Sequence, residues 1–196
     1  MKPLRRTPTA VQVAATVKTA AAVTLLAALI LSASSAPNVR AQTSRGATGA
    51  VRAAEGFYRH HFSRDGRSRS FLPENIRQLR RWLSPELYRL MMYEFRREAE
   101  FRKTHPDDVP FMTGDPFTNS QESPDTFRVG RAVVRGRRAS VPVTFGWRDM
   151  ADYPKYTLRV ELLKLEGRWL IHNVKPNEGS DLLKLLRRPV YDSDVR

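Results

Sequence analysis

The sequence contains no cysteine. Without thiols the chain cannot form disulfide bonds, thiolate metal sites or a cysteine nucleophile, and it cannot be lipidated through cysteine. Its fold must therefore depend on packing alone. The 155 residues that follow position 41 of the 196 are enough for a core, because a domain of that size buries about two-thirds of its unfolded surface.

Long apolar runs are also scarce, and the one near the N-terminus is short. It extends over 12 residues, from Ala20 to Leu31, whereas a membrane-spanning helix needs about 20. Basic residues without any acidic ones precede it, and small residues lead to Val39-Arg40-Ala41. This pattern predicts a signal peptide over residues 1–41, cleaved after Ala41. We expect a periplasmic or extracellular protein with no stable transmembrane span after cleavage. An uncleaved membrane anchor is the alternative interpretation.

Positive charge is in excess, with a formal net charge of +14. Five of the basic residues belong to the predicted leader, which leaves about +9 for the rest of the chain. Such an excess favours an anionic partner, such as lipid headgroups, an acidic polysaccharide or nucleic acid. The arginines are interleaved with acidic residues along the chain, so a basic, solvated surface is the simpler interpretation. The predicted export argues against nucleic acid.

The first half of the predicted domain is helical. After a flexible start over residues 42–46, an apolar stripe at helical spacing predicts a helix over residues 47–62. A short helix is expected from Pro73 or Glu74 to Leu83. Ser84-Pro85 is typical of a helix start, because serine accepts free backbone amides and proline suits the first helical position. That third helix is predicted to end near Thr104.

The second half has the alternating pattern of strands. Residues 106–125 are rich in Pro, Asp, Asn and Ser and predict a long structured loop. Strands are expected over residues 127–134, 139–147, 156–165 and 168–174, followed by a short helix over 180–188 capped by Ser180. Pro142 indicates that its strand lies at a sheet edge. The prediction is one α+β domain over residues 47–190, with helices packed on a curved antiparallel sheet, and a frayed tail over 191–196.

Several motifs carry a resemblance that covers roughly residues 51–188. They are Phe57-Tyr58, Leu83-Ser84-Pro85-Glu86-Leu87, Gly114-Asp115-Pro116-Phe117-Thr118-Asn119, Phe127-Arg128-Val129-Gly130, Gly167-Arg168-Trp169-Leu170-Ile171 and Ser180-Asp181-Leu182-Leu183. In these stretches the chain resembles a group of uncharacterised exported bacterial domains allied to the nuclear transport factor 2-like, or cystatin-like cone, superfamily. The resemblance implies a cone-shaped α+β fold. It implies no activity, because that superfamily includes isomerases, dehydratases, ligand binders and dimerisation modules.

Two side chains are weak candidates for catalysis. Asp115 precedes a proline in a loop, and at the mouth of a cone its carboxylate could act as a general base. An aspartate before proline more commonly accepts backbone amides and fixes a turn, which is the favoured interpretation. His61 lies on the apolar stripe of the first predicted helix and could exchange protons near neutral pH. A histidine in such a position is more often part of the core.

The predicted ligand pocket is composed mainly of aromatic residues. Its predicted members are Tyr58, His61, Tyr88, Asp115, Phe117, Trp147 and Trp169. Large aromatic residues at helix and strand periods are usually core residues. No metal site is predicted, because the acidic residues of the 106–125 loop do not have the spacing of a calcium loop. No cofactor is predicted either, because phosphate loops, nucleophile elbows and dinucleotide motifs are absent from the sequence.

Three functional hypotheses follow from the sequence. The leading one is an exported, non-catalytic domain that binds a small ligand or an envelope protein. The second is a cone-fold enzyme that uses Asp115, with His61, for proton transfer. The third is an envelope immunity or inhibitor protein that acts through the 106–125 loop. Homodimerisation is left open.

Overall fold

The computed structural model of the chain describes residues 36–62, 71–108, 112, 114–150 and 152–188. The chain divides into two compact units, residues 1–37 and 38–196, and the fold described below is that of the second unit. Residues 1–35 of the predicted signal peptide and the predicted tail over 191–196 lie outside the described residues. Residues 109–111 and 113 of the predicted loop lie outside them as well.

The long first helix, α1 (Ala36–His61), begins earlier than the sequence pattern predicts. Residues 42–46 are helical in the structure, although we expected a flexible start there. Their polar composition contains no apolar stripe from which a helix could be predicted. A side chain carbon at Gly46 would lie 3.7 Å from Val134. The helix therefore approaches the sheet at this point, and that packing is a tertiary contact that the local pattern does not contain.

Two shorter helical segments and one long helix follow. They are α2 (Pro73–Leu79), the 3₁₀ turn η1 (Arg80–Trp82) and α3 (Pro85–Phe101). Ser84 is the N-cap of α3, and its Oγ accepts a hydrogen bond from the Leu87 amide at 3.2 Å. The predicted Ser84-Pro85 start is confirmed, and the serine satisfies an amide that would otherwise have no partner.

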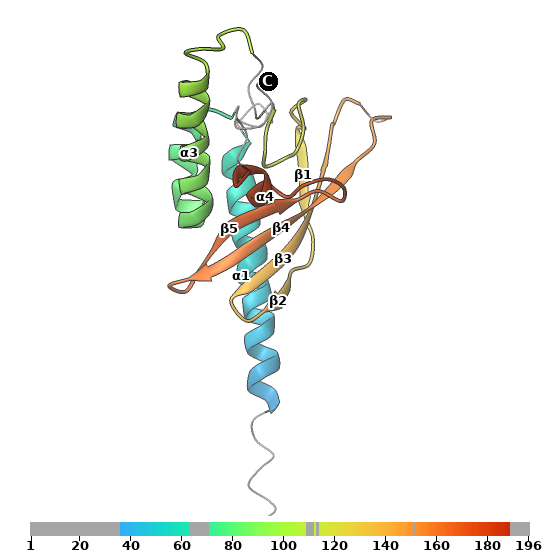
Figure 1. Ribbon diagram of the computed structural model, residues 1–196. Coiled ribbons are helices and arrows are strands. Elements are labelled where there is room, and N and C mark those ends of the chain that lie inside the picture. The colour runs from blue at the N-terminus through green and yellow to red at the C-terminus, as the bar shows by residue number, and fades with distance from the viewer. Residues whose placement is uncertain (1–35, 63–70, 109–111, 113, 151, 189–196) are drawn as a thin grey trace, which may run out of the picture. The chain divides into compact units, whose positions relative to one another are not determined.

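The strands form one five-stranded antiparallel sheet that does not close (Figure 1). The strands are β1 (Thr126–Val129), β2 (Val133–Arg135), β3 (Arg138–Gly146), β4 (Tyr156–Leu165) and β5 (Arg168–Lys175). Their order is β1-β3-β4-β5, with β2 paired to β3 beside β1. The predicted α+β class with an antiparallel sheet is confirmed. Among the described residues, no helix is both long and apolar enough to cross a membrane.

The prediction that Pro142 marks an edge strand is wrong, because β3 lies between β4 and the β1–β2 pair. The Pro142 carbonyl accepts a hydrogen bond from the Gly130 amide at 2.8 Å. In an antiparallel ladder the N and C=O of one residue face the same neighbour. The proline nitrogen therefore faces the gap between β1 and β2, where no ladder bond is required. Gly130 is needed there, since a Cβ would lie 2.8 Å from the Pro142 ring.

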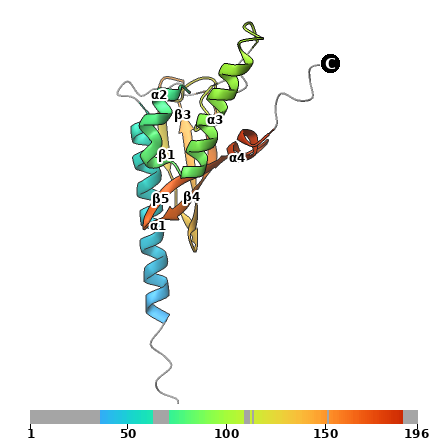
Figure 2. The same cartoon turned by 60° about the vertical axis from the view of Figure 1, so that its left-hand side comes forward.

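The core lies between the helices and one face of the sheet. That face carries Val141, Val143 and Phe145 of β3 and the residues that pair with them on β4. Helix α1 runs along the sheet in both views (Figures 1 and 2), and the ring of Tyr58 packs against that of Phe145 at 5.3 Å between centroids.

The last helix, α4 (Leu182–Leu186), lies next to β5 and α3. We expected Ser180 to cap this helix, but Asp181 does so by accepting a hydrogen bond from the Lys184 amide at 2.9 Å. Because α4 begins at Leu182, Asp181 and not Ser180 is the residue directly before the helix. The carboxylate of Asp181 also interacts favourably with the positive end of the helix.

Candidate functional site

The two residues singled out as candidates for proton transfer are bonded to each other. His61 is the last residue of α1, and its Nε2 lies 2.7 Å from Oδ2 of Asp115. Both side chains are buried, with exposures of 2% for His61 and 6% for Asp115. The imidazole stacks on the ring of Phe57 and meets the ring of Phe117 edge-on. The imidazole of His61 is therefore enclosed by aromatic rings.

Asp115 also organises the turn in which it lies. Its Oδ1 accepts a hydrogen bond from the Phe117 amide, and its Oδ2 accepts one from the Thr118 hydroxyl, both at 2.9 Å. The Asp115 amide donates to the Ser120 carbonyl at 2.9 Å and so closes the turn. The turn-forming role favoured from the sequence is present in this geometry. The same carboxylate thus orders a loop and binds the helix that ends at His61.

Two tyrosines hold the tip of this turn from outside it. The Tyr58 hydroxyl donates to the Phe117 carbonyl at 2.9 Å, and the Tyr156 hydroxyl donates to the Thr118 carbonyl at 2.7 Å. Burial, together with the Asp115 charge, raises the pKa of Tyr58 well above its usual value. Burial also raises the pKa of Tyr156 to about 12. Both hydroxyls therefore remain protonated donors at neutral pH.

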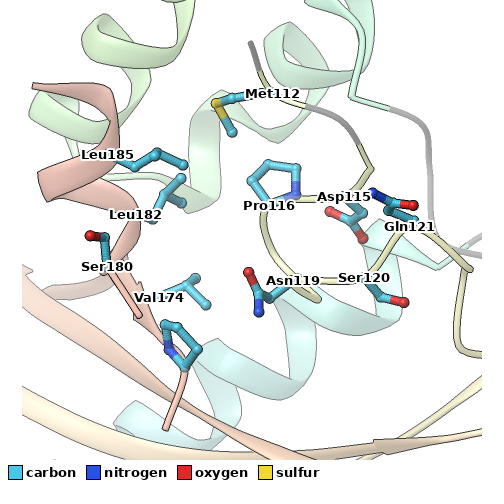
Figure 3. Close-up of a pocket in the computed structure, with 11 residues that line it drawn as sticks. Met112, Asp115, Pro116, Asn119, Ser120, Gln121, Val174, Ser180, Leu182 and Leu185 are labelled. Carbon is cyan, nitrogen blue, oxygen red and sulfur yellow. The ribbon is translucent and has the colours of Figure 1, made fainter. Parts of the chain in front are cut away.

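A cavity of about 310 Å³ lies beside the turn, between Asp115 and Asn119 on one side and Leu182 and Leu185 of α4 on the other (Figure 3). Asp115 is the one titratable side chain among the described residues that line it, and His61 does not reach it. The other polar side chains among its described lining residues are uncharged amides and hydroxyls.

The structure brings only part of the predicted pocket together. Tyr58, His61, Asp115 and Phe117 meet at the turn. The other three predicted members lie elsewhere: Tyr88 beneath the Arg80 guanidinium, Trp147 against the rings of Tyr153 and Tyr156, and Trp169 against Gly49 of α1. Thr118 and Tyr156, which are not among the predicted pocket members, also hold the turn, and the alternation of β4 places Tyr156 on the same face as Leu158.

The acidic residues of the 106–125 loop do not gather into a site. Asp125 accepts a hydrogen bond from the Arg148 amide at 2.8 Å, and Asp115 bonds within its own turn and to His61. Over the described ranges, no group of three His, Cys, Asp or Glu side chains is arranged to hold a metal ion.

A second buried polar cluster joins β5 to α3 and α4, and no local pattern in the sequence predicts it. Nδ1 of His172 lies 3.0 Å from the Ser84 hydroxyl, which caps α3. Oδ1 of Asn173 accepts hydrogen bonds from the amides of Val174 and Leu183, each at 3.0 Å. Burial lowers the pKa of His172, so the imidazole is neutral at pH 7. These contacts join α3 and α4 to β5.

Taken together, the geometry defines an α+β domain whose best-placed acid–base residues are part of its interior. The chain matches no protein-family model, no curated protein and no solved structure. Its function must therefore be argued from the placement of its own side chains.

Proposed function

We propose that this chain is an exported, non-catalytic binding or interaction domain of the cell envelope, with the cone-like fold that its sequence motifs resemble. One observation carries the proposal. His61 and Asp115, the two residues best suited to proton transfer, are bonded at 2.7 Å and buried in the core.

The space that a cone-fold enzyme would use for its substrate is filled with aromatic rings. Phe57, Tyr58, Phe117 and Phe145 are each fully buried there. The ring centroids of Phe57 and Phe117 are 4.9 Å apart, as are those of Phe57 and Tyr58. Rings at such separations are in van der Waals contact and leave no room for a substrate between them.

The enzyme hypothesis is not supported by the hydrogen bonding of Asp115. A general base must reach the proton that it removes, directly or through one water molecule. The two oxygens of Asp115 already accept bonds from His61, Phe117 and Thr118. A substrate in the adjacent cavity would find no second catalytic group among the described lining residues.

The inhibitor hypothesis requires a loop that projects toward another protein. Residues 114–120 of the predicted loop are instead held inward. Phe117 is fully buried, and the hydroxyls of Tyr58 and Tyr156 donate hydrogen bonds to two backbone carbonyls of this segment. This anchoring favours a role for residues 114–120 within the fold and leaves the exposed surface as the place for a partner.

A stability comparison tests the structural role of the pair. We expect Asp115→Ala in the full chain to lower the free energy of unfolding by at least about 2 kcal/mol, because it leaves buried donors without an acceptor. Asp107→Ala, at an exposed position, is the matched control and should change stability by less than about 0.5 kcal/mol. Chemical denaturation followed by tryptophan fluorescence provides the measurement.

A different result for Asp115→Ala would support the enzyme hypothesis. If the purified chain turned over a substrate, and Asp115→Ala abolished turnover without lowering the free energy of unfolding, the non-catalytic proposal would be wrong. The stability measurement separates the two cases, since a structural residue cannot be removed without a loss of stability.

A further inference from the structure

The face of the sheet opposite the core carries a pair of like charges. Arg135 of β2 and Arg138 of β3 are direct cross-strand partners, and both are exposed. Like charges in directly opposite positions destabilise a sheet. Within the described part of the chain, neither guanidinium forms an ion pair with a carboxylate. Two adjacent guanidinium groups without a carboxylate partner attract an anion.

These two arginines line a groove of about 460 Å³ that crosses the sheet. Arg159 of β4 lines the same groove, together with Ser140 and Glu161. Three strands therefore each contribute a guanidinium to one concavity. The only acid among its described lining residues is Glu161, which is paired with Lys175 at 2.9 Å.

A second groove, of about 500 Å³, continues from the first. The two grooves share Arg138 and Glu161, and the second extends over β5 to the last helix. It adds the cationic side chains of Lys184, Arg188 and Arg187, the last of which is paired with Glu86. Its other acid, Asp181, caps α4. We call the two grooves together the basic trough; its cations are Arg135, Arg138, Arg159, Lys184, Arg187 and Arg188.

We propose that the basic trough binds an acidic polysaccharide. This inference rests on the proposed function and specifies its partner. Guanidinium groups match carboxylate and sulfate groups with two parallel hydrogen bonds. The Ser140 hydroxyl supplies a hydrogen-bonding group for sugar hydroxyls on the same surface. A repeating anionic sugar chain presents both kinds of group at intervals.

The course of the trough distinguishes this partner from a peptide or a membrane. A peptide that adds to a sheet pairs with an edge strand, whereas the trough runs across β2, β3 and β4. A bilayer surface is planar on this scale, whereas the cations of the trough lie around concavities. A second copy of the chain would bring arginines against arginines if the two sheets packed face to face, and that arrangement is unfavourable.

The test measures binding of oligogalacturonate to the full chain by isothermal titration calorimetry, at low and at physiological salt. The trough variant combines Arg135→Gln, Arg138→Gln and Arg159→Gln. The matched control combines Arg52→Gln, Arg59→Gln and Arg77→Gln, which removes the same charge from exposed helical positions. We expect binding that weakens with salt, a loss of about tenfold in the trough variant, and a change within about twofold in the control.

Three outcomes would overturn the inference. Equal weakening in both triple variants would show that net charge alone attracts the oligosaccharide. Trough-dependent binding to phosphatidylglycerol vesicles or to polyglutamate, without binding to oligogalacturonate, would assign the trough to another partner. Absence of binding to all of these polyanions would remove the trough as a site. None of these results concerns turnover, so the non-catalytic proposal would stand or fall separately on the Asp115→Ala comparison.

Discussion

The hydroxyl of Tyr58 donates a hydrogen bond of 2.9 Å to the carbonyl of Phe117, a residue 59 positions later in the chain. Both side chains are fully buried. The bond joins α1 to the turn over residues 114–120, next to the contact between His61 and Asp115. Two long-range polar contacts thus fix one turn inside an apolar core, where each is worth more than it would be at the surface.

The first prediction concerns this bond. Tyr58→Phe keeps the ring in place but leaves the buried Phe117 carbonyl without its donor, so we expect the free energy of unfolding to fall by about 1–3 kcal/mol. Tyr93→Phe, where the side chain is 50% exposed, should leave stability unchanged within about 0.5 kcal/mol. Equal denaturation midpoints for the two variants would show that water replaces the lost hydroxyl at Phe117.

Local signals in the sequence were enough to predict most elements of the fold. Ser84-Pro85 begins α3 because its chemistry acts within one helical turn. The alternation from Ala139 to Phe145 predicted β3 because side chains on a strand point to opposite faces in turn. The place of β3 in the sheet could not be predicted, since the Gly130–Pro142 contact that makes a central proline tolerable joins two separate segments.

In the candidate site, too, the individual residues could be predicted from local sequence, whereas the contact between them could not. His61 and Asp115 could each be selected from the sequence, one for its place on a helical stripe and the other for its place before a proline. Their bond could not be predicted, because it depends on how residues 54 positions apart meet in three dimensions. The basic trough was hidden for a similar reason. Its cations come from segments far apart in the sequence, and only the pairing of strands and the packing of α4 bring them to one surface.

Two glycines of α1 provide an opposed pair of substitutions. A Cβ at Gly56 would lie 2.5 Å from the ring of Trp82, so Gly56→Ala should lower the free energy of unfolding by about 1–3 kcal/mol. A Cβ at Gly46 would lie 3.7 Å from Val134, an ordinary contact, so Gly46→Ala should raise it by about 0.5–1 kcal/mol through helix propensity. Thermal unfolding followed by circular dichroism measures both changes. Stabilisation by Gly56→Ala would show that α1 and η1 are less closely packed than the structure indicates.

The high pKa of Tyr156 predicts a loss of stability in alkali. Its folded-state pKa of about 12 exceeds the usual tyrosine value of about 10. Between these values the hydroxyl ionises in the unfolded chain but not in the folded one, so stability is complete below pH 10 and falls as pH rises toward 12. The free energy of unfolding measured from pH 9 to 11 should therefore fall less steeply in Tyr156→Phe than in the unsubstituted chain. Parallel profiles would show that Tyr156 titrates normally.

The last prediction concerns acid and His172, whose pKa is lowered chiefly by burial. Charged groups from several elements also act on it; Arg138 and Arg187 lower its pKa, whereas Glu86 and Glu161 raise it. Above the usual histidine pKa of about 6.5 both states are neutral and stability is complete. Below it the unfolded chain takes up a proton that the folded chain resists, so stability falls until pH passes the lower folded-state pKa.

We therefore expect the free energy of unfolding to decrease between pH 7 and 5, and to decrease less in His172→Gln. His105→Gln is the control, because this histidine lies beside Thr104 at the C-terminal end of α3 and does not contact the Ser84 cap. If His172→Gln and His105→Gln flattened the profile equally, the acid sensitivity would come from general charge repulsion in a basic protein. A flattening specific to His172→Gln would instead locate it in the contact that joins β5 to the N-cap of α3.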